Sequence, residues 1–284
     1  MHVLGKAPTV FVCTPEAFED VEKIQYEAFG RNPLFVEATT DVLGQGVFAI
    51  SGPLWHHQRK TASRLISTQM IQHNMDVVVP DKCKELMKRL DAAASEENPI
   101  DRVVSLKWRL DLFTMDVFCK VGFGIDMHKM ETEKIIAMLE ALQRSSARIV
   151  GRILEPSWFW KLRRDLNIGA ERQFTKDMEC VNDMICGFIA PSIEEKAQRD
   201  QVEAKEDEKD SRMDLISLYL DQDAADNGKD APFDPKKQRD FLVSFLAAGQ
   251  DTTSTSMSWF VVMINRYPKV LDKNSRQDAG PCEW

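Results

Sequence analysis

The residues with the clearest chemical potential lie at the centre of the apolar stretch 241–265. Asp251 and Thr252 place a carboxyl group beside a hydroxyl group that both donates and accepts hydrogen bonds. Groups of these types serve as general acids and bases. On a helix the two side chains point about 100° apart, so neither duplicates the other. Gly249, just before them, lowers helix stability by about 1 kcal/mol relative to Ala.

One long helix is predicted to position these residues. Asp234 is a good N-cap, Pro235 a good first helical residue, and Pro268 ends the pattern. A helix over residues 235–266 is about 48 Å long, and its apolar residues on all sides predict burial. Polar residues at the centre of a buried helix violate local rules, and such violations are expected at functional sites. The alternative is a core helix with a Gly kink and Thr side chains bonded to helix carbonyls.

A second candidate group lies nearly 200 residues earlier. Trp55 and Arg59 are four apart and share a face on a helix, where an indole N–H and a guanidinium fork together suit a carboxylate. The alternative is a Trp packed beneath an Arg stem. The adjacent His56 and His57 point to different faces and have no further ligands at suitable spacing, so we expect no metal site from side chains.

The segment Ala248-Gly249-Gln250-Asp251-Thr252-Thr253 resembles the signature on the central helix of the cytochrome P-450 haem-thiolate monooxygenases. The resemblance implies a haem cofactor below this helix. Ala248 and Gly249 would line the oxygen site, and Asp251 and Thr252 would deliver protons. Trp55 and Arg59 resemble the Trp-x-x-x-Arg element that holds a haem propionate in this family.

The run from Phe113 to Asp126 resembles a Phe-x-x-Asp…Phe-Gly-x-Asp stretch of the fatty-acid hydroxylases in the same family. The resemblance implies a small lipophilic substrate and electrons from NADPH through a cytochrome reductase. It also implies that the full-length protein lies on the cytoplasmic face of the endoplasmic reticulum membrane, held by an N-terminal anchor. Cys119 falls within the helical pattern, where a buried, inert thiol is expected.

The remaining pattern predicts a mainly α, incomplete cytochrome P-450 fold with minimal β-structure. We expect one strand at residues 8–13, loops at 39–53 and 92–98, an aromatic-rich connection at 155–160 and a linker at 221–230. The connection either packs beneath the next helix or forms an exposed patch. Helices are expected at these ranges: 75–94, 103–122, 131–150, 175–189 and 213–220.

Composition narrows the function classes. The net charge of −8 gives no reason to expect nucleic acid as a partner. Six Cys without a paired motif and without a secretory signal favour a reduced, intracellular setting. No apolar run approaches the length of about 20 residues that a membrane-spanning helix needs.

The family's haem-ligating Cys loop has no counterpart in these 284 residues, because Cys282 lacks the surrounding Phe, Arg and Gly. We therefore expect a partial cytochrome P-450 domain at residues 1–270, lacking the N-terminal anchor and the haem-Cys region, and a divergent tail at 271–284. Two functions follow: a monooxygenase that hydroxylates an unactivated C–H bond, or a haem-free helical remnant that is inactive or acts through partners. For the chain as written, we expect loss of stable thiolate-ligated haem.

Overall fold

The computed structural model describes residues 10–64, 67–96, 98, 103–127, 132–201, 215–227 and 234–270. Within these ranges the chain forms helices and short connections and no strand, which confirms the mainly α prediction. The chain divides into two compact units, residues 1–67 with 133–244 and residues 68–132 with 245–284. None of the helices described is both long and apolar enough to cross a bilayer.

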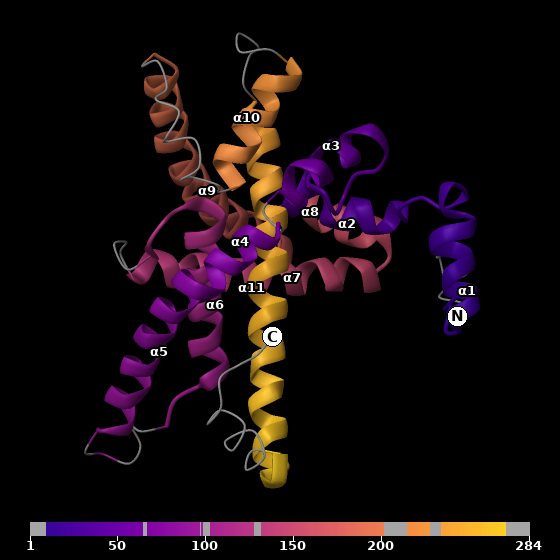
Figure 1. Ribbon diagram of the computed structural model, residues 1–284. Helices are drawn as coiled ribbons and strands as arrows, with labels where there is room; N and C mark the ends of the chain where they lie inside the picture. Colours follow the sequence, from indigo (N-terminus) through magenta and orange to yellow (C-terminus); the bar gives the residue numbers. More distant parts are fainter. Residues whose placement is uncertain are drawn as a thin grey trace. The chain divides into compact units, whose positions relative to one another are not determined.

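The first unit holds most of the helices (Figure 1). They are α1 (Pro15–Glu19), α2 (Pro33–Leu43), α3 (Gly52–Ser63), α7 (Thr132–Leu154), α8 (Ser157–Asp165), α9 (Ala170–Gln201), α10 (Leu215–Asn227) and the first part of α11 (Pro235–Arg266). A π-helical turn (Asp20–Ile24) and a 3-10 turn (Tyr26–Ala28) follow α1. The N-cap of α1 is Thr14, because the hydroxyl of Thr14 accepts from the amide of Ala17 at 3.3 Å.

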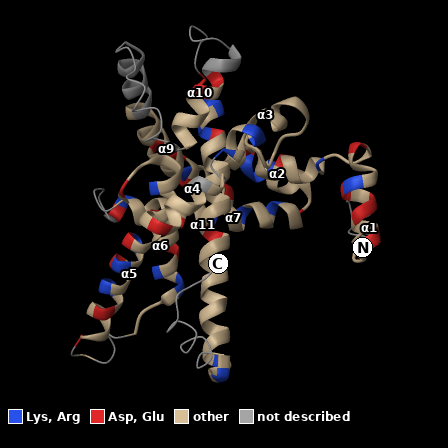
Figure 2. Ribbon diagram, in the orientation of Figure 1, with Lys and Arg blue, Asp and Glu red and all other residues tan. Residues whose placement is uncertain are grey.

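The second unit consists of α4 (Thr68–His73), a π-helical turn (Asn74–Val78), α5 (Val79–Ala94), α6 (Leu106–Phe123) and the second part of α11. Ser105 caps the start of α6, and Gly124 ends it in the left-handed conformation with φ of 71°. Figure 2 shows that α5 carries charges of both signs along its length. The buried face of α6 includes Leu110, Met115 and Cys119.

The glycine-rich segment after α2 packs against the first part of α11. A Cβ on Gly46 would lie 1.8 Å from Ser244 Oγ, so only glycine allows this approach. The amide of Gln45 donates to Asp240 Oδ2 at 2.8 Å. The predicted loop at 39–53 is therefore wrong at both ends: α2 extends to Leu43, α3 begins at Gly52, and only the turns between them are loop-like.

A buried ion cluster joins four helices of the first unit. Arg152 on α7 is fully buried and donates to Glu171 Oε2 on α9 at 2.5 Å and to Asp41 Oδ2 on α2 at 2.8 Å. Its guanidinium lies 4.6 Å from the ring centroid of Trp160 on α8 and 4.3 Å from that of Phe174. Charge, hydrogen bonds and aromatic faces together compensate for the burial of this cation.

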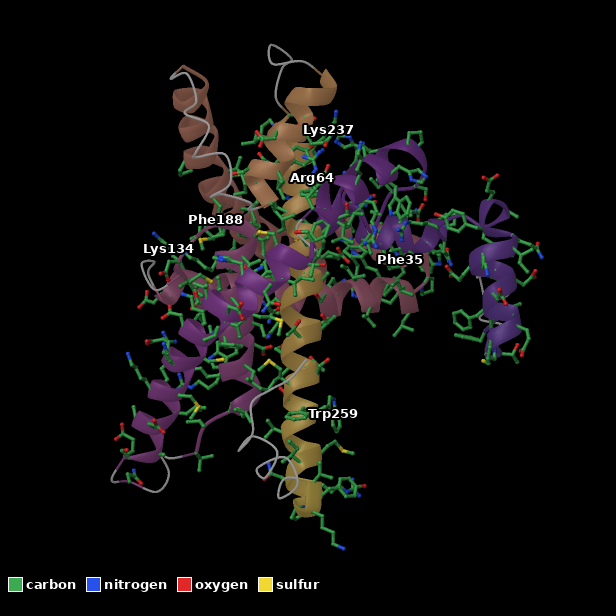
Figure 3. The ribbon with its side chains drawn as sticks, viewed as in Figure 1. Phe35, Arg64, Lys134, Phe188, Lys237 and Trp259 are labelled. Atoms are coloured by element: carbon green, nitrogen blue, oxygen red, sulfur yellow. The ribbon has the colours of Figure 1, made fainter. Side chains whose placement is uncertain are left out.

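The helix predicted over residues 235–266 is confirmed at both ends by α11. Asp234 Oδ1 accepts from the amide of Lys236 at 3.0 Å, which confirms the N-cap. Its first part is buried, with Phe241, Leu242 and Val243 at 0% exposure. The prediction of burial along the whole helix is wrong after its centre, where Trp259 is 63% exposed (Figure 3). Apolar residues favour burial, but the described residues leave most of the Trp259 side chain uncovered.

Three further expectations need correction. Residues 10–13 form no strand, and residues 8–9 lie outside the described ranges. The linker predicted at 221–230 continues α10 up to Asn227, so the helix is longer than its apolar run. The connection at 155–160 already starts α8, where Trp160 is 2% exposed and packs while Trp158 is 68% exposed. Residues 271–284, the predicted divergent tail, are also outside the described part.

Candidate functional site

The four predicted residues of α11 lie within two helical turns of the second unit. Ala248 and Gly249 are half-buried, whereas Asp251 and Thr252 are exposed. The hydroxyl of Thr252 donates to the carbonyl of Ala248 at 2.6 Å, a bond back to the preceding turn that the alternative interpretation anticipated. The expectation that the Asp251 carboxylate is buried is wrong, since its side chain is 58% exposed.

Gly249 on α11 lies directly against the Phe118 side chain of α6. A Cβ at this position would come within 2.6 Å of Cδ2 of Phe118. The Phe118 ring is held in turn by an edge-on contact with Phe123, with centroids 5.6 Å apart. The absence of a side chain at Gly249 therefore sets the spacing of two helices within this unit.

Behind Asp251 and Thr252 lies a set of polar contacts between α6 and α11, which we call the α6–α11 polar clamp. Asp111, whose side chain is 3% exposed, accepts from Ser254 Oγ at 2.5 Å, from Gln250 Nε2 at 3.2 Å and from the ammonium group of Lys107. The clamp consists of Lys107, Asp111 and Thr114 on α6 and of Gln250 and Ser254 on α11.

Sequence reasoning missed the clamp. The available signal was the spacing of four between Lys107 and Asp111 and between Gln250 and Ser254, which places each pair on one helix face. Residues of these types with that spacing are usually exposed, and only the packing of α6 on α11 makes them a buried network.

Trp55 and Arg59 belong to α3 of the first unit, as the helical spacing predicted. Trp55 is half-buried with its ring edge-on to His56 at 4.9 Å between centroids, and Arg59 is exposed. Neither the indole N–H nor the guanidinium has a protein acceptor among the residues described. Because α3 and the centre of α11 fall in different units, a joint site remains a prediction.

The two aspartates of the Phe113–Asp126 run have a structural role in the second unit. Lys82 on α5, only 4% exposed, contacts Asp116 Oδ1 at 3.0 Å and Asp126 Oδ1 at 2.9 Å. Burial lowers the pKa of Lys82, but the hydrogen bonds and charges of the two carboxylates outweigh burial and raise it. Cys119 lies on the same helix at 0% exposure, and burial raises the pKa of its thiol far above the usual range. It is the inert thiol predicted.

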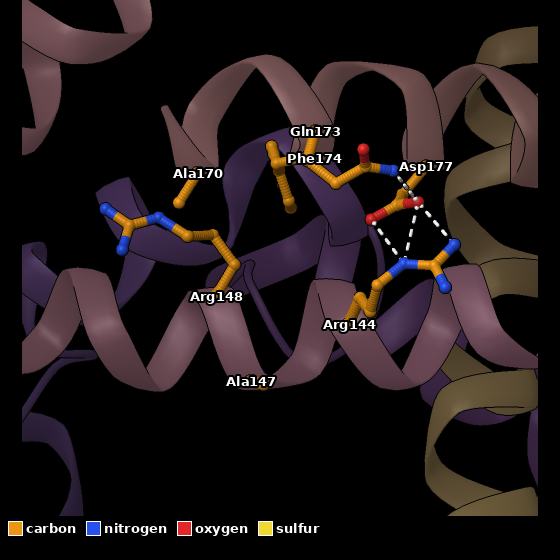
Figure 4. A pocket seen from close by; sticks show the side chains of 7 residues that line it. All are labelled: Arg144, Ala147, Arg148, Ala170, Gln173, Phe174 and Asp177. Carbon is orange, nitrogen blue, oxygen red and sulfur yellow. Dashed lines mark hydrogen bonds and ion pairs between the residues drawn. The ribbon is translucent and has the colours of Figure 1, made fainter. Parts of the chain in front are cut away.

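A cavity of about 310 Å³ lies between α7 and α9 of the first unit (Figure 4). Arg144 and Arg148 line it from α7, and Phe174 lines it from the facing helix α9. Arg144 is engaged by Asp177, with Nη2 2.8 Å from Oδ1, and Arg148 donates to Glu171 Oε1 at 2.6 Å. The cavity therefore offers apolar surface between satisfied charges. The ranges described contain no cluster of His, Cys, Asp or Glu that could hold a metal ion.

Comparison with known proteins places the whole pattern in one family. The family model described as Cytochrome P450 matches residues 1–276. Cytochrome P450 CYP94D108 of Paris polyphylla is 30% identical over 95% of this chain and 52% of its own length. Cytochrome P450 86B1 of Arabidopsis thaliana is 27% identical over 97% of this chain and 49% of its own length. The chain spans about half the length of the curated relatives it matches. With its central-helix signature embedded in a match along nearly the whole sequence, the chain belongs to the cytochrome P450 family.

Proposed function

We propose that this chain contributes the oxygen- and proton-handling side of a haem monooxygenase that hydroxylates an unactivated C–H bond. One observation carries the proposal. The central turn of α11 combines a glycine at a close helix approach with an exposed carboxylate and an exposed hydroxyl, at Gly249, Asp251 and Thr252. Helix stability gives no reason for the two exposed residues Asp251 and Thr252, because both are poorer helix formers than Ala.

The residues present fit a haem group in their donor chemistry. Trp55 offers one N–H and Arg59 a fork of N–H groups, and neither is engaged by a protein acceptor among the described residues. A propionate carboxylate is the partner that such donors favour. When bound, the haem would supply the oxygen-activating chemistry, and the protein would supply binding, orientation and proton transfer.

Proton transfer is the task that we assign to the exposed pair. The Thr252 hydroxyl keeps its lone pairs available while donating to the carbonyl of Ala248, so it can accept one proton and pass on another. Asp251 points about 100° away round the helix, with Oδ1 3.6 Å from Lys107 Nζ. In this arrangement Asp251 exchanges protons with solvent, and Thr252 presents them at the other face of the turn.

For the substrate we propose a fatty acid or a similar lipophilic molecule. Support comes from the Phe113–Asp126 run, whose pattern resembles that of fatty-acid hydroxylases. Lys82 holds both aspartates of this run in the second unit. Electrons would come from NADPH through a cytochrome reductase at the cytoplasmic face of the endoplasmic reticulum membrane.

The test supplies a full-length version that includes the haem-ligating Cys loop, loaded with haem, with reductase, NADPH, saturated fatty acids and isotopically labelled dioxygen. We expect a product that gains one labelled oxygen atom. Arg59→Ala should lower haem retention, whereas the matched variant Lys60→Ala, on the next exposed position of α3, should retain haem like the wild type. Retained haem without any oxygenated product, or a product oxygen derived from water, would contradict the proposed activity.

A further inference from the structure

Asp111 is a buried carboxylate that packing alone does not explain. It sits in the middle of the contact between α6 and α11 and accepts from donors on both helices: Ser254 and Gln250 from α11, and Lys107 from its own helix. An ionised group in such a position costs several kcal/mol in lost hydration before its partners compensate. Apolar residues of similar volume would join the two helices at no such cost. The Asp111 carboxylate therefore adds little net stability, and its role is to fix the orientation of α11 against α6.

Asp111 fixes the rotation of α11 about its own axis. Gln250 and Ser254 are one turn apart and face α6, and the two residues between them that we propose for proton transfer are Asp251 and Thr252. Thr252 points about 160° away from Gln250 round the helix axis. Because the helix backbone is rigid over one turn, fixing the first and last residue of this turn fixes the direction of the hydroxyl on its far side.

Two other contacts limit how far the same turn can slide along the helix axis and how closely it can approach α6. The hydroxyl of Thr114 lies 3.1 Å from the carbonyl oxygen of Gln250, which limits sliding along the helix axis. The Phe118 ring against Gly249 limits the approach of the two helices. Together with Asp111 these contacts determine rotation, axial position and distance.

Lys107 links the clamp to the proposed acid itself. Its ammonium group contacts Asp111, lies 3.0 Å from Ser254 Oγ and stands 3.6 Å from Asp251 Oδ1. One cation therefore bridges a buried carboxylate and an exposed one. An exposed pair of this kind adds little stability by itself, but it limits the directions in which the Asp251 side chain points.

We propose that Asp111 is a positioning residue for proton transfer, acting through Ser254, Gln250 and Lys107 to hold the turn that carries Asp251 and Thr252 in one orientation. This inference rests on the proposed function. The proposed function assigned Asp251 and Thr252 to proton transfer, and the inference adds Asp111 as the buried carboxylate that orients them.

The first test measures amide hydrogen exchange along α11 in Asp111→Asn. We expect exchange at residues 250–256 to rise by about ten-fold, because a hydrogen bond to a charged group is roughly twice as strong as a neutral one. Exchange at residues 238–243, in the other unit, should not change. The matched control is Asp116→Asn, which removes a carboxylate from the same helix but one that pairs with Lys82 on α5. Equal exchange in the two variants, or a rise spread over both units, would overturn the proposal.

The second test asks whether orientation matters for chemistry. In the haem-loaded full-length protein, Asp111→Asn should lower product formed per NADPH consumed while leaving KM unchanged. Ser254→Ala, which removes one donor and keeps the carboxylate, should give a smaller loss of the same kind and serves if Asp111→Asn folds poorly. A normal ratio in Asp111→Asn together with faster exchange would show a clamp without a positioning role and would reject the inference. Failure of the proposed function is distinguishable, since it would appear in the wild-type protein as the absence of product.

Discussion

The ring of Phe118 occupies the space that a side chain on Gly249 would need. A Cβ there would stand 2.6 Å from Cδ2 and 2.8 Å from Cε2 of the ring. Within the second unit, α6 can therefore lie this close to the central turn of α11 because Gly249 has no Cβ. Glycine in the middle of a helix is unfavourable on propensity grounds, and this contact is the compensation that the structure provides.

Gly249→Ala should therefore destabilise the protein. We expect a loss of about 1–3 kcal/mol in the free energy of unfolding from overpacking against Phe118, partly offset by about 1 kcal/mol of helix propensity. Urea unfolding followed by circular dichroism measures it. The matched control is Gly187→Ala, on an exposed face of α9 with nothing within 4 Å of the added Cβ, which should stabilise instead. Phe118→Leu should restore part of the loss in a double variant, and strict additivity would disprove the contact.

Arg152→Met should destabilise the first unit strongly. Among the described residues, the change leaves the buried carboxylate of Glu171 with Arg148 alone as an ion-pair partner, and it removes the cation that lies against Trp160 and Phe174. Breaking a buried pair on one side costs about 3–5 kcal/mol. Denaturant unfolding provides the measurement.

The control for Arg152 is Lys161→Met. Lys161 Nζ pairs with Glu37 Oε2 at 2.9 Å on the surface of the same unit, with the two side chains 37% and 45% exposed. Pairs of this kind contribute about 0–1 kcal/mol. A loss from Lys161→Met as large as that from Arg152→Met would mean that burial does not determine the effect.

The ion pairs that Arg148 and Arg152 make with Glu155 and Glu171 should make the stability of the protein depend on pH. Hydrogen bonds from Arg148 lower the pKa of Glu155, despite some burial. Burial raises the pKa of Glu171, but hydrogen bonds from Arg152 and Arg148 outweigh it, and the pKa is lowered. Carboxyl groups whose pKa is lower in the folded state contribute stability that is present above the unfolded value of 4.5 and lost as pH falls through the folded value.

We therefore expect the free energy of unfolding to fall with pH below about 4.5. Glu155→Gln should be less stable near neutral pH and should lose less stability on acidification than the wild type. The measurement is the urea midpoint across the acidic range. Parallel curves for the two proteins would show that Glu155 titrates alike when folded and unfolded.

Local signals allowed accurate prediction of both ends of α11. Asp234, Pro235 and Pro268 act within a few residues of where they stand, so the bounds of α11 could be predicted from them. The segment before α3 was misjudged because its glycines were taken as loop signals. Gly46 is there for its close approach to Ser244, a contact across almost 200 residues of sequence that no local pattern contains.

The candidate site divides in the same way. The motif at residues 248–253 could be located, and the relative directions of Asp251 and Thr252 follow from helix geometry alone. The exposure of Asp251 and the burial of Asp111 could not be predicted, because both depend on which face of α6 meets α11. A carboxylate on a helix is by default assumed to be exposed, and that default was wrong at Asp111, the position that organises the contact.

Thr252→Ala should separate oxygen consumption from product formation in a full-length version that includes the haem-ligating Cys loop. The hydroxyl is exposed and donates to the carbonyl of Ala248 in its own helix, and the methyl group of Ala can neither accept nor donate a proton. General acid–base groups contribute about 10²–10⁴-fold to rate. We expect NADPH use to continue while its reducing equivalents appear as peroxide. Thr252→Ser, which keeps the hydroxyl, should retain most of the coupling, and Asp251→Asn should slow turnover because an amide does not exchange protons in this range.

Thr253→Ala is the matched control for Thr252→Ala. Thr253 is also exposed, differs in sequence position by one residue, and points about 100° away round the helix. Thr253→Ala removes the same side-chain atoms as Thr252→Ala, but it leaves the hydrogen bond from Thr252 to Ala248 intact. The measurement is NADPH consumed against product formed for each variant. If Thr253→Ala lost coupling while Thr252→Ala kept it, protons would reach the site from the adjacent face of α11, and the roles assigned to Asp251 and Thr252 would both have to be withdrawn.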